Sequence, residues 1–306
     1  MNILVTGAAG FLGSHLCDYL LKNNHKVIGV DNYFRGKAEN LPVHSNFKFY
    51  KFDLTQNFKF IIENENPEII FHYAAINGTK YFYDIPYKVL NDNILINQNL
   101  LIACQDSNVK KIIYTSSSEV YGPTPVIPTS ENEPIILHSL SNRDSYASSK
   151  AFGEFQIRIW CEQNGIDWLI LRPFNTYGPR MVSGGYGQVI PELIQRMKED
   201  EFYIYGNGNQ TRSFCYVEDH IKIAYILMHK SKNQIVNIGF DEEITILDLA
   251  KKIKKIYNNK NKIGFKDAWE NDTKWRKPSL LKLLSYVKNF TFTSLDEGLL
   301  NMKKLF

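Results

Sequence analysis

A glycine motif at the start of the chain limits what it can fold into. Residues 5–16, VTGAAGFLGSHL, place a glycine at every third position directly after an apolar run. In a strand–turn–helix unit, such glycines allow a tight turn, close approach of a pyrophosphate, and close packing of helix on sheet. The helix start then offers unpaired amide donors to the phosphates. The motif predicts five residues of a dinucleotide site: Gly7, Gly10, Phe11, Leu12 and Gly13.

Short apolar segments alternate with helical segments through the first half of the chain. The expected strands are 2–6, 26–31, 48–53, 68–72, 111–115 and 167–172, and the expected helices are 11–23, 56–64, 91–107 and 146–164. This alternation predicts a parallel sheet with helices on both faces. We therefore expect an α/β fold, a Rossmann-type doubly wound parallel sheet followed by a smaller C-terminal α/β lobe.

Carboxylates at the strand ends indicate which dinucleotide binds. Asp31 ends the second strand, eighteen residues beyond Gly13. A carboxylate there accepts hydrogen bonds from ribose hydroxyls and repels a 2′-phosphate, which favours NAD over NADP. Arg35 argues for NADP, but Asp31 holds the strand-end position. We add to the cofactor site Asn32, which follows Asp31, and Asp53 and Leu54 at the third strand end, although Asp53 is equally well explained as a helix cap.

A tyrosine and a lysine suggest the chemistry. Tyr146 and Lys150 are four residues apart, so on a helix they share one face. A tyrosine with a pKa of about 10 is a poor base at neutral pH. An ammonium group and a positive nicotinamide ring beside it would both lower that pKa. The pair then suits a general base for a sugar hydroxyl, although the spacing alone equally fits a surface pair.

A further strand, in KIIYTSSSEVYG (111–122), ends in three serines and Glu119. The carboxyl ends of parallel strands are where ligands bind in open α/β sheets. With the glycine motif and Tyr146–Lys150, this stretch resembles the extended short-chain dehydrogenase/reductase superfamily, in its NAD-dependent nucleotide-sugar epimerase/dehydratase family. The resemblance covers essentially the whole chain. Other similar stretches are FHYAA (71–75), SSSEVYG (116–122), RPFNTYGPR (172–180), YGNGNQTRSFCYVEDH (205–220) and WRKPS (275–279).

The resemblance implies roles for these residues in oxidising C4 of a nucleotide-diphosphate sugar. Ser117 would bind the 4-hydroxyl, Tyr146 would take its proton as hydride passes to NAD⁺, and Lys150 would bind the nicotinamide ribose. Glu119 would act at C5 or only hold the hydroxyl cluster. The remaining cofactor residues expected are Ala74, Ala75 and Asn93, the last mainly architectural. The remaining substrate residues expected are Ser118, Lys80, Asn175, Gln188, Val189, Arg212 and Arg276.

Three of these substrate residues also have simpler explanations. The guanidinium groups of Arg212 and Arg276 match phosphate oxygens, but each arginine alone is equally well explained by a surface ion pair. Lys80 is equally well explained as a solvated loop lysine. The glycine-rich loop 183–188 is expected to close over the sugar.

The reaction that follows C4 oxidation is less certain from the sequence. Sugar 4,6-dehydratases carry Asp-Glu where this chain has Ser118-Glu119, which disfavours that activity. Three serines before VYG favour a 4-epimerase, with a 4-dehydrogenase that releases a 4-keto sugar as one alternative. UDP-glucuronate decarboxylases share Ser-Glu and Arg-Lys-Pro, but not the loop INGTKYFYDIP (76–86). A non-catalytic NAD(H) sensor or scaffold would typically have lost Tyr146 or Lys150.

Composition narrows the range of partners. A net charge of +4 on 306 residues is too small a bias to indicate nucleic acid. The four cysteines are far apart in the sequence and form no Cys-x-x-Cys pair of the kind that binds metals, so no metal is expected. We expect no signal peptide, since the N-terminus MNILVTG runs straight into a strand, and no membrane span, since no apolar run approaches about 20 residues. The cysteines resemble reduced cytosolic thiols, so we expect a cytoplasmic location. Apolar faces on 91–107 and 146–164 resemble the dimer-forming helices of related enzymes, which implies a homodimer.

The pattern of predicted strands and helices changes near residue 174, which suggests a domain boundary there. Beyond residue 174, glycine-rich loops and shorter helices replace the regular alternation of strands and helices. We expect residues 1–174 to form the NAD-binding Rossmann domain and residues 175–306 to form the nucleotide-sugar-binding lobe. The chain is expected to return to the first domain within 213–239.

Overall fold

The computed structural model describes residues 1–306 except 185–187, 199–201, 268–273 and 304–306. Seven parallel strands form the central sheet in the order β11-β6-β5-β4-β1-β2-β3. The sheet contains β1 (Asn2–Thr6), β2 (Lys26–Asp31), β3 (Phe47–Lys51), β4 (Ile69–His72), β5 (Lys111–Thr115), β6 (Asp167–Pro173) and β11 (Gln234–Ile238). The order reverses at β1, which confirms the predicted doubly wound α/β fold.

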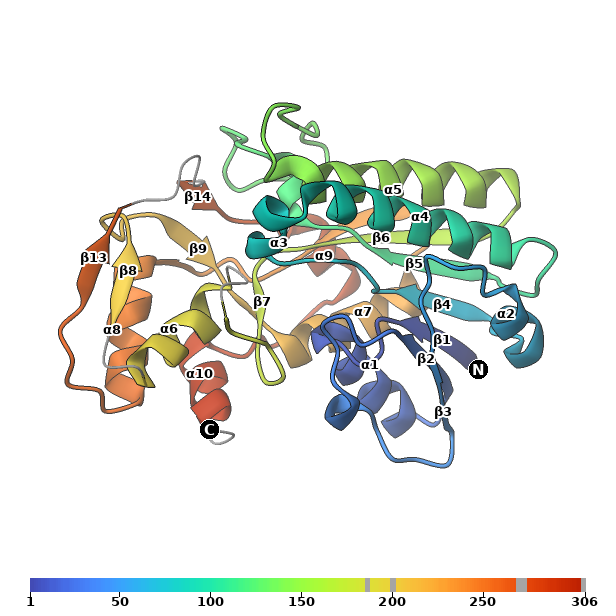
Figure 1. The fold of residues 1–306 in the computed structure, drawn as a ribbon, viewed down its shortest axis with the longest axis horizontal. Coiled ribbons are helices and arrows are strands. Elements are labelled where there is room, and N and C mark those ends of the chain that lie inside the picture. Colours follow the sequence, from blue (N-terminus) through green and yellow to red (C-terminus); the bar gives the residue numbers. More distant parts are fainter. Residues whose placement is uncertain (185–187, 199–201, 268–273, 304–306) are drawn as a thin grey trace.

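Helices cover both faces of this sheet, as Figure 1 shows. On one face lie α1 (Phe11–Lys22) and α7 (Val217–Lys230), which contact each other. On the other lie α2 (Lys59–Glu65), α4 (Pro86–Cys104) and α5 (Asp144–Gln163), and α4 packs lengthwise on α5. Because both faces are covered, strands such as β5 and β6 are buried along nearly their whole length.

The segment after β4 differs from the prediction. A short helix, α3 (Thr79–Asp84), was not predicted, and α4 begins at Pro86 instead of residue 91. Proline at the first position of a helix has no amide hydrogen to leave unpaired, so it starts a helix well. Gly78, with φ of 141°, precedes α3. This unpredicted turn of helix brings residues 79–84 against the active site.

The second lobe, at the left of Figure 1, is built from small sheets and helices. One sheet has the order β12-β9-β14, and β13-β8 and β10-β7 form two-stranded sheets. The strands are β7 (Thr176–Tyr177), β8 (Tyr203–Tyr205), β9 (Thr211–Ser213), β10 (Cys215–Tyr216), β12 (Glu243–Thr245), β13 (Gly264–Lys266) and β14 (Trp275–Arg276). The helices of this lobe are α6 (Val189–Lys198), α8 (Ile246–Ile256) and α10 (Leu295–Lys303), whereas α9 (Leu281–Tyr286) lies against β11 and α7 of the central sheet.

Two apolar cores lie on opposite faces of the central sheet. The core beneath α2, α4 and α5 stays within the sheet domain. The core beneath α1 and α7 continues into the second lobe, so that Leu16, Leu193, Leu249 and Leu299 belong to one contiguous cluster. After the first part of the second lobe, the chain returns to the sheet domain, where α7 packs against α1 and β6 and β11 pairs with β6.

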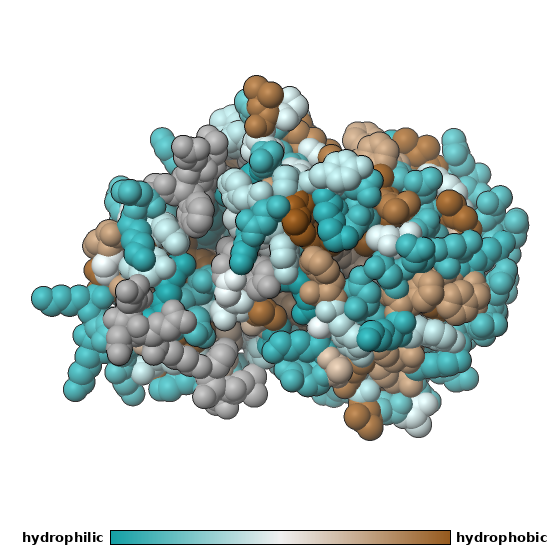
Figure 2. Space-filling model, in the orientation of Figure 1, coloured by the Kyte–Doolittle hydropathy of each residue, from teal (hydrophilic) through white to brown (hydrophobic). Residues whose placement is uncertain are grey.

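The outer surface is mainly polar. On the face seen in Figure 2, hydrophilic side chains cover most of the surface and hydrophobic ones are scattered among them. None of the helices in the described part of the chain is both long and apolar enough to cross a membrane.

Candidate active site

The glycine motif forms a close-fitting turn at the sheet edge. Gly7 has φ of +71°, and a Cβ added there would lie 3.0 Å from the backbone nitrogen of Ala74. A Cβ at Gly13 would fall on the carbonyl oxygen of Gly7. Helix α1 begins beside this turn without a side-chain cap, so its first amides are available to an anionic ligand.

This turn opens into a cavity of about 230 Å³. Eleven of the predicted cofactor residues line it: Gly7, Gly10, Phe11, Leu12, Gly13, Asp31, Asn32, Asp53, Leu54, Ala74 and Ala75. The Asp31 carboxylate accepts hydrogen bonds from the amides of Ala9 (3.1 Å) and Tyr33 (2.7 Å). Burial raises the pKa of Asp31, and these hydrogen bonds oppose the shift.

One further residue of this cavity suits a pyrophosphate. Arg180 lines the cavity, and its Nη2 forms an ion pair with Asp18 at 2.8 Å. Its Nη1 is buried and has no hydrogen-bond partner among the described residues. A buried donor of this kind is costly to leave unpaired. Together with the glycine turn, Arg180 makes the cavity fit NAD, and sequence reasoning did not select it.

Asn93 lies outside both cavities. Its amide oxygen accepts from the amide of Ile76 at 2.7 Å, and its Nδ2 donates to the carbonyl of Ile76 and to Ser149 Oγ. It therefore ties α4 to α5 and to the loop after β4. These hydrogen bonds favour the architectural role, and both that role and a direct contact with the cofactor stay predictions.

The three serines after β5 have different surroundings. Ser116 Oγ donates to Glu154 Oε1 at 2.5 Å, and both Glu154 oxygens accept from the buried Arg172, at 2.8 and 2.6 Å. Ser117 Oγ accepts a hydrogen bond from the backbone amide of Glu119 at 3.2 Å, and the Ser117 side chain also forms a hydrogen bond with the Tyr146 hydroxyl. Ser118 is buried at the start of the 3₁₀ turn η2 (Ser118–Tyr121). Ser116 is thus structural, and Ser117 faces the tyrosine.

Tyr146 and Lys150 lie side by side on α5, both almost fully buried. Burial and the charge of Glu119 raise the pKa of Tyr146, while the hydrogen bond with Ser117 opposes that rise. Burial lowers the pKa of Lys150 to about 7. The Lys150 Nζ donates to the carbonyl of Thr115 at 2.7 Å and lies 5.9 Å from the centre of the Tyr146 ring.

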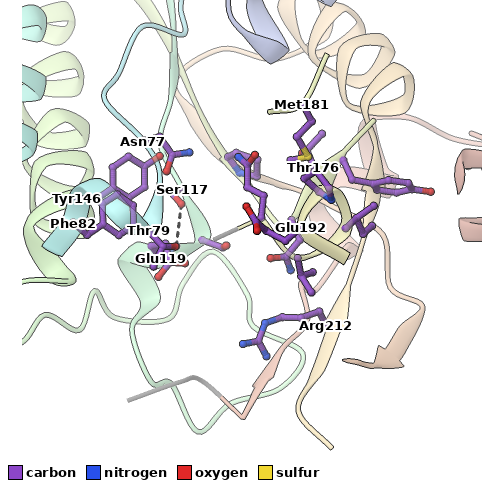
Figure 3. Close-up of a pocket in the computed structure, with 18 of the residues that line it drawn as sticks. Asn77, Thr79, Phe82, Ser117, Glu119, Tyr146, Thr176, Met181, Glu192 and Arg212 are labelled. Atoms are coloured by element: carbon purple, nitrogen blue, oxygen red, sulfur yellow. Dashed lines mark hydrogen bonds between the residues drawn. The ribbon is translucent and has the colours of Figure 1, made fainter. Parts of the chain in front are cut away.

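Phe82, from the unpredicted helix α3, stacks on Tyr146. The two ring centres are 5.0 Å apart and the planes differ by 11°. In Figure 3 the two rings lie face to face beside Ser117, on the side of the pocket opposite Met181. One face of the tyrosine is therefore covered by an apolar ring.

Glu119 is held between two arginines. Arg276, on β14, donates to both of its oxygens, one of them at 3.2 Å, and Arg143 Nη2 lies 3.8 Å away. Burial alone would raise the pKa of Glu119, but Arg276, Arg143 and Arg212 outweigh it and lower the pKa to about 2. Glu119 is therefore ionised at neutral pH. Sequence reasoning missed Arg143, which lies in the polar run SNRDS.

These groups line one end of a second cavity of about 860 Å³. All predicted catalytic and substrate residues line it: Tyr146, Lys150, Ser117, Glu119, Ser118, Lys80, Asn175, Gln188, Val189, Arg212 and Arg276. Part of the loop 183–188, expected to close over the sugar, lies outside the described residues. At the other end, the guanidinium of Arg196 lies 4.4 and 5.0 Å from the ring centres of Tyr203 and Tyr205.

The two cavities meet beside the tyrosine. Six residues line both of them: Phe11, Leu12, Tyr73, Ala75, Asn77 and Gln188. A dinucleotide in the smaller cavity would therefore approach a ligand in the larger one near Ser117 and Tyr146. No cluster of His, Cys, Asp or Glu within the described ranges has the makings of a metal site.

Comparison with known proteins agrees with this arrangement. UDP-glucuronic acid decarboxylase 1 of Xenopus tropicalis is 31% identical over 302 residues, covering 97% of this chain and 70% of the relative. UDP-N-acetyl-alpha-D-glucosaminuronate decarboxylase of Bacillus cytotoxicus is 33% identical over 317 residues, covering 97% and 94%.

Solved structures match over nearly the full length. UDP-glucose 4-epimerase of Thermotoga maritima, with UDP-glucose, has a TM-score of 0.92 at 31% identity, covering 99% of this chain and 98% of the other. UDP-glucuronic acid 4-epimerase of Bacillus cereus, with UDP-glucuronic acid and NAD, has a TM-score of 0.88 at 31% identity and 100% coverage of both. The family model described as NAD dependent epimerase/dehydratase matches residues 3–239. The chain therefore belongs to the NAD-dependent epimerase/dehydratase family and is an NAD-dependent enzyme.

Proposed function

We propose that this enzyme oxidises C4 of a UDP-linked hexose and reduces it again in the same site, as a 4-epimerase does. The observation that carries the proposal is the Ser117–Tyr146–Lys150 group, placed where the cofactor cavity meets the larger cavity. The printed names of the similar proteins add support, since all of those compared above act on or bind UDP-sugars.

The three side chains divide the proton chemistry among them. Ser117 holds the 4-hydroxyl, and Tyr146 accepts its proton. Lys150, whose pKa burial lowers to about 7, stabilises the phenolate against the cost of burial when it is protonated. The cavity lined by the glycine turn and Arg180 would hold NAD, which would supply a hydride acceptor for C4 and a positively charged nicotinamide ring. Without that ring, burial keeps Tyr146 protonated, so proton removal is coupled to an occupied cofactor site.

The rest of the cavity suits a nucleoside diphosphate. Arg212 on β9 and Arg276 on β14 are direct partners in the parallel register of these strands. Two adjacent guanidinium groups match diphosphate oxygens. Beyond them, Tyr203, Tyr205 and Arg196 provide flat surfaces on which a pyrimidine base can stack.

The setting of Glu119 favours a decarboxylase as the second candidate. A hexuronic acid oxidised at C4 is a β-keto acid, which loses carbon dioxide readily. Such a substrate needs positive charge near C6, and Arg143 and Arg276 both lie beside Glu119. The curated relatives named above are decarboxylases of UDP-linked uronic acids. A dehydrogenase that releases the keto sugar has no comparable support here.

Product analysis tests the proposal. Purified protein would be incubated with NAD⁺ and UDP-, GDP-, dTDP- and CDP-sugars, with mass spectrometry, sugar stereochemistry and NADH absorbance followed together. An epimer of unchanged mass without net NADH supports the proposal. Loss of carbon dioxide would support the second candidate, and stoichiometric NADH with loss of two hydrogens would mean a dehydrogenase. Tyr146→Phe should abolish whichever reaction is seen; full activity in that variant would refute the assigned site.

We further propose that the enzyme is a homodimer. Three apolar residues, Phe152, Phe155 and Ile159, form a stripe on α5 and are each about half exposed. Their spacing of three and four residues places them on one helix face. This face points away from the sheet and suits pairing with the same face of a second copy.

We propose a cytoplasmic location and a two-domain division at residue 174. The four cysteines are free and buried, as is usual where thiols stay reduced. The return of α7 and β11 to the central sheet agrees with the expected return within 213–239. Cell fractionation would test the location, and chemical denaturation would show whether the two parts of the chain unfold together or separately.

A further inference from the structure

The ammonium group of Lys150 lies against an aromatic ring that has no role so far. Its Nζ, besides donating to the carbonyl oxygen of Thr115, is 4.8 Å from the centre of the Tyr114 ring, nearer than the 5.9 Å to the ring of Tyr146. Both Lys150 and Tyr114 are almost fully buried. A cation over the face of an aromatic ring within about 6 Å of its centre is attracted by that ring, and more strongly where water is excluded.

Neighbouring elements fix the position of the Tyr114 ring on β5. His72, its direct partner in the register of β4, stacks on it with ring centres 5.9 Å apart and planes 25° apart. The Tyr114 hydroxyl forms a hydrogen bond with the side chain of Asn97 on α4. On α5, a Cβ added at Gly153 would lie 2.2 Å from that hydroxyl oxygen. The glycine one turn beyond Lys150 therefore makes room for this ring.

The titratable groups around Lys150 offer its charge limited support. Burial lowers the pKa of Lys150 to about 7, and the negative charge of Glu154 opposes that shift. Both oxygens of Glu154 are engaged by Arg172, which offsets this charge. Burial and the charge of Lys150 lower the pKa of His72 to about 3, so His72 is neutral. Burial keeps the two tyrosines beside Lys150 protonated. The electron-rich face of an aromatic ring is then a substantial source of stabilisation for the ammonium.

Resting on the role proposed above for Lys150, we propose that Tyr114 is a positioning residue whose ring face holds the Lys150 ammonium beside Tyr146 and keeps it charged. Tyr114 lines neither cavity, so it acts on the reaction only through the lysine. The protonated lysine is the form that stabilises the phenolate of Tyr146. The ring therefore raises the fraction of enzyme that is ready for proton removal.

Substitutions at Tyr114 separate the ring face from the hydroxyl. Tyr114→Phe keeps the ring, whereas Tyr114→Leu removes it and leaves the site apolar. Phe58→Leu removes a buried ring from the same core, lines neither cavity and serves as the control for lost packing. NAD-free proteins containing lysine labelled at the ε-carbon would be titrated by NMR, with the Lys150 signal assigned by its loss in Lys150→Met. The pKa of Lys150 should fall by about one unit in Tyr114→Leu and stay close to wild type in Tyr114→Phe and Phe58→Leu.

Activity on UDP-glucose shows whether the held charge matters. At a pH of about 7.5, a drop of about one unit from a pKa of about 7 should reduce the protonated fraction of Lys150, and with it kcat/KM, by roughly 5- to 10-fold in Tyr114→Leu. At a pH of about 5.5, Lys150 is mostly protonated in both proteins, so the loss should be less than about 2-fold. Tyr114→Phe should retain wild-type kcat/KM at both pH values. An equal loss at both, or an equal loss in Tyr114→Phe, would mean that Tyr114 is only structural.

The titration needs no turnover, so it separates failure of this inference from failure of the proposed function. An unchanged or raised pKa of Lys150 in Tyr114→Leu would overturn the inference even if C4 oxidation occurs. A lowered pKa that Tyr114→Phe does not show supports it even if UDP-glucose does not react. Full activity of Lys150→Met would instead refute the role that the proposed function gives to the lysine.

Discussion

The stack of Phe82 on Tyr146 gives the most direct test of the active-site geometry. The rings are 5.0 Å apart and nearly parallel, and Phe82 is only 4% exposed. A stacked aromatic pair contributes about 0.5–1.5 kcal/mol beyond simple burial. If this energy holds Tyr146 in its reactive orientation, Phe82→Leu should lower kcat/KM by roughly 3- to 10-fold, since about 1.4 kcal/mol corresponds to a factor of ten.

The same substitution should shift the pH profile. Burial is the largest cause of the raised pKa of Tyr146, and Phe82 covers one face of its ring. Phe82→Ala should admit water and so lower that pKa, because the phenolate becomes better solvated. The reaction needs the deprotonated form, so the acidic limb of kcat/KM should move to lower pH. Phe82→Leu, which keeps most of the apolar cover, should move it less.

A matched control separates these effects from lost stability. Phe292 stacks on Phe240 with centres 5.1 Å apart and planes 25° apart, and neither ring lines a cavity described above. Phe292→Leu and Phe82→Leu should both lower the free energy of unfolding by about 1–2 kcal/mol. Only the Phe82 variants should change kcat/KM and the acidic limb. An unchanged kcat/KM and pH limb in Phe82→Ala would refute a positioning role for the stack.

Four further predictions concern the rest of the molecule. Lys150 has a folded-state pKa near 7, below the usual value of about 10.4. The folded state therefore releases this proton first, and the unfolding free energy of NAD-free protein should rise between about pH 7 and 10, by at most about 1.4 kcal/mol per pH unit. Chemical denaturation should show this rise in wild type and a smaller one in Lys150→Met; identical slopes would contradict the low pKa. Arg172→Met leaves Glu154 charged and buried and should cost about 3–5 kcal/mol in urea unfolding, with partial recovery in Glu154→Gln/Arg172→Met. Gly13→Ala should reduce the NAD that co-purifies with the protein, measured after acid release, because its Cβ would fall on the Gly7 carbonyl; wild-type NAD content would argue against the turn as the cofactor site. Phe155→Glu should convert the dimer to monomers by light scattering at micromolar concentration, and a monomeric wild type would refute the dimer itself.

The parts of the site that follow from the sequence are those set by local geometry. The glycine turn, the carboxylate of Asp31 at a strand end and the shared face of Tyr146 and Lys150 all depend on spacings of a few residues. The doubly wound parallel sheet also follows, because apolar runs alternating with helices leave few right-handed topologies, although its strand order was not predicted. These features could be predicted, and the predicted site residues other than Asn93 line the two cavities.

The parts that did not follow depend on distant contacts or weak local signals. The pairing of Glu119 with Arg276 joins residues 157 positions apart, and no local pattern indicates it. Helix α3 has only six residues, too few for periodicity to show. Its contact with Tyr146 through Phe82 was therefore missed. Arg143 was missed because it lies in a run of polar residues with no pattern of its own. Only its place at the start of α5 directs it into the site.

The apolar core that runs from α1 and α7 into α6, α8 and α10 has a mechanical consequence. Two lobes joined only by a hinge can rotate as separate bodies, but lobes that share side chains in one close-packed interior cannot separate without exposing that interior. Opening and closing of the substrate cavity must therefore come from loops at its rim. For the same reason the lobes should unfold in a single transition, and a fragment ending at residue 174 would lose α7, which together with α1 covers one face of the sheet.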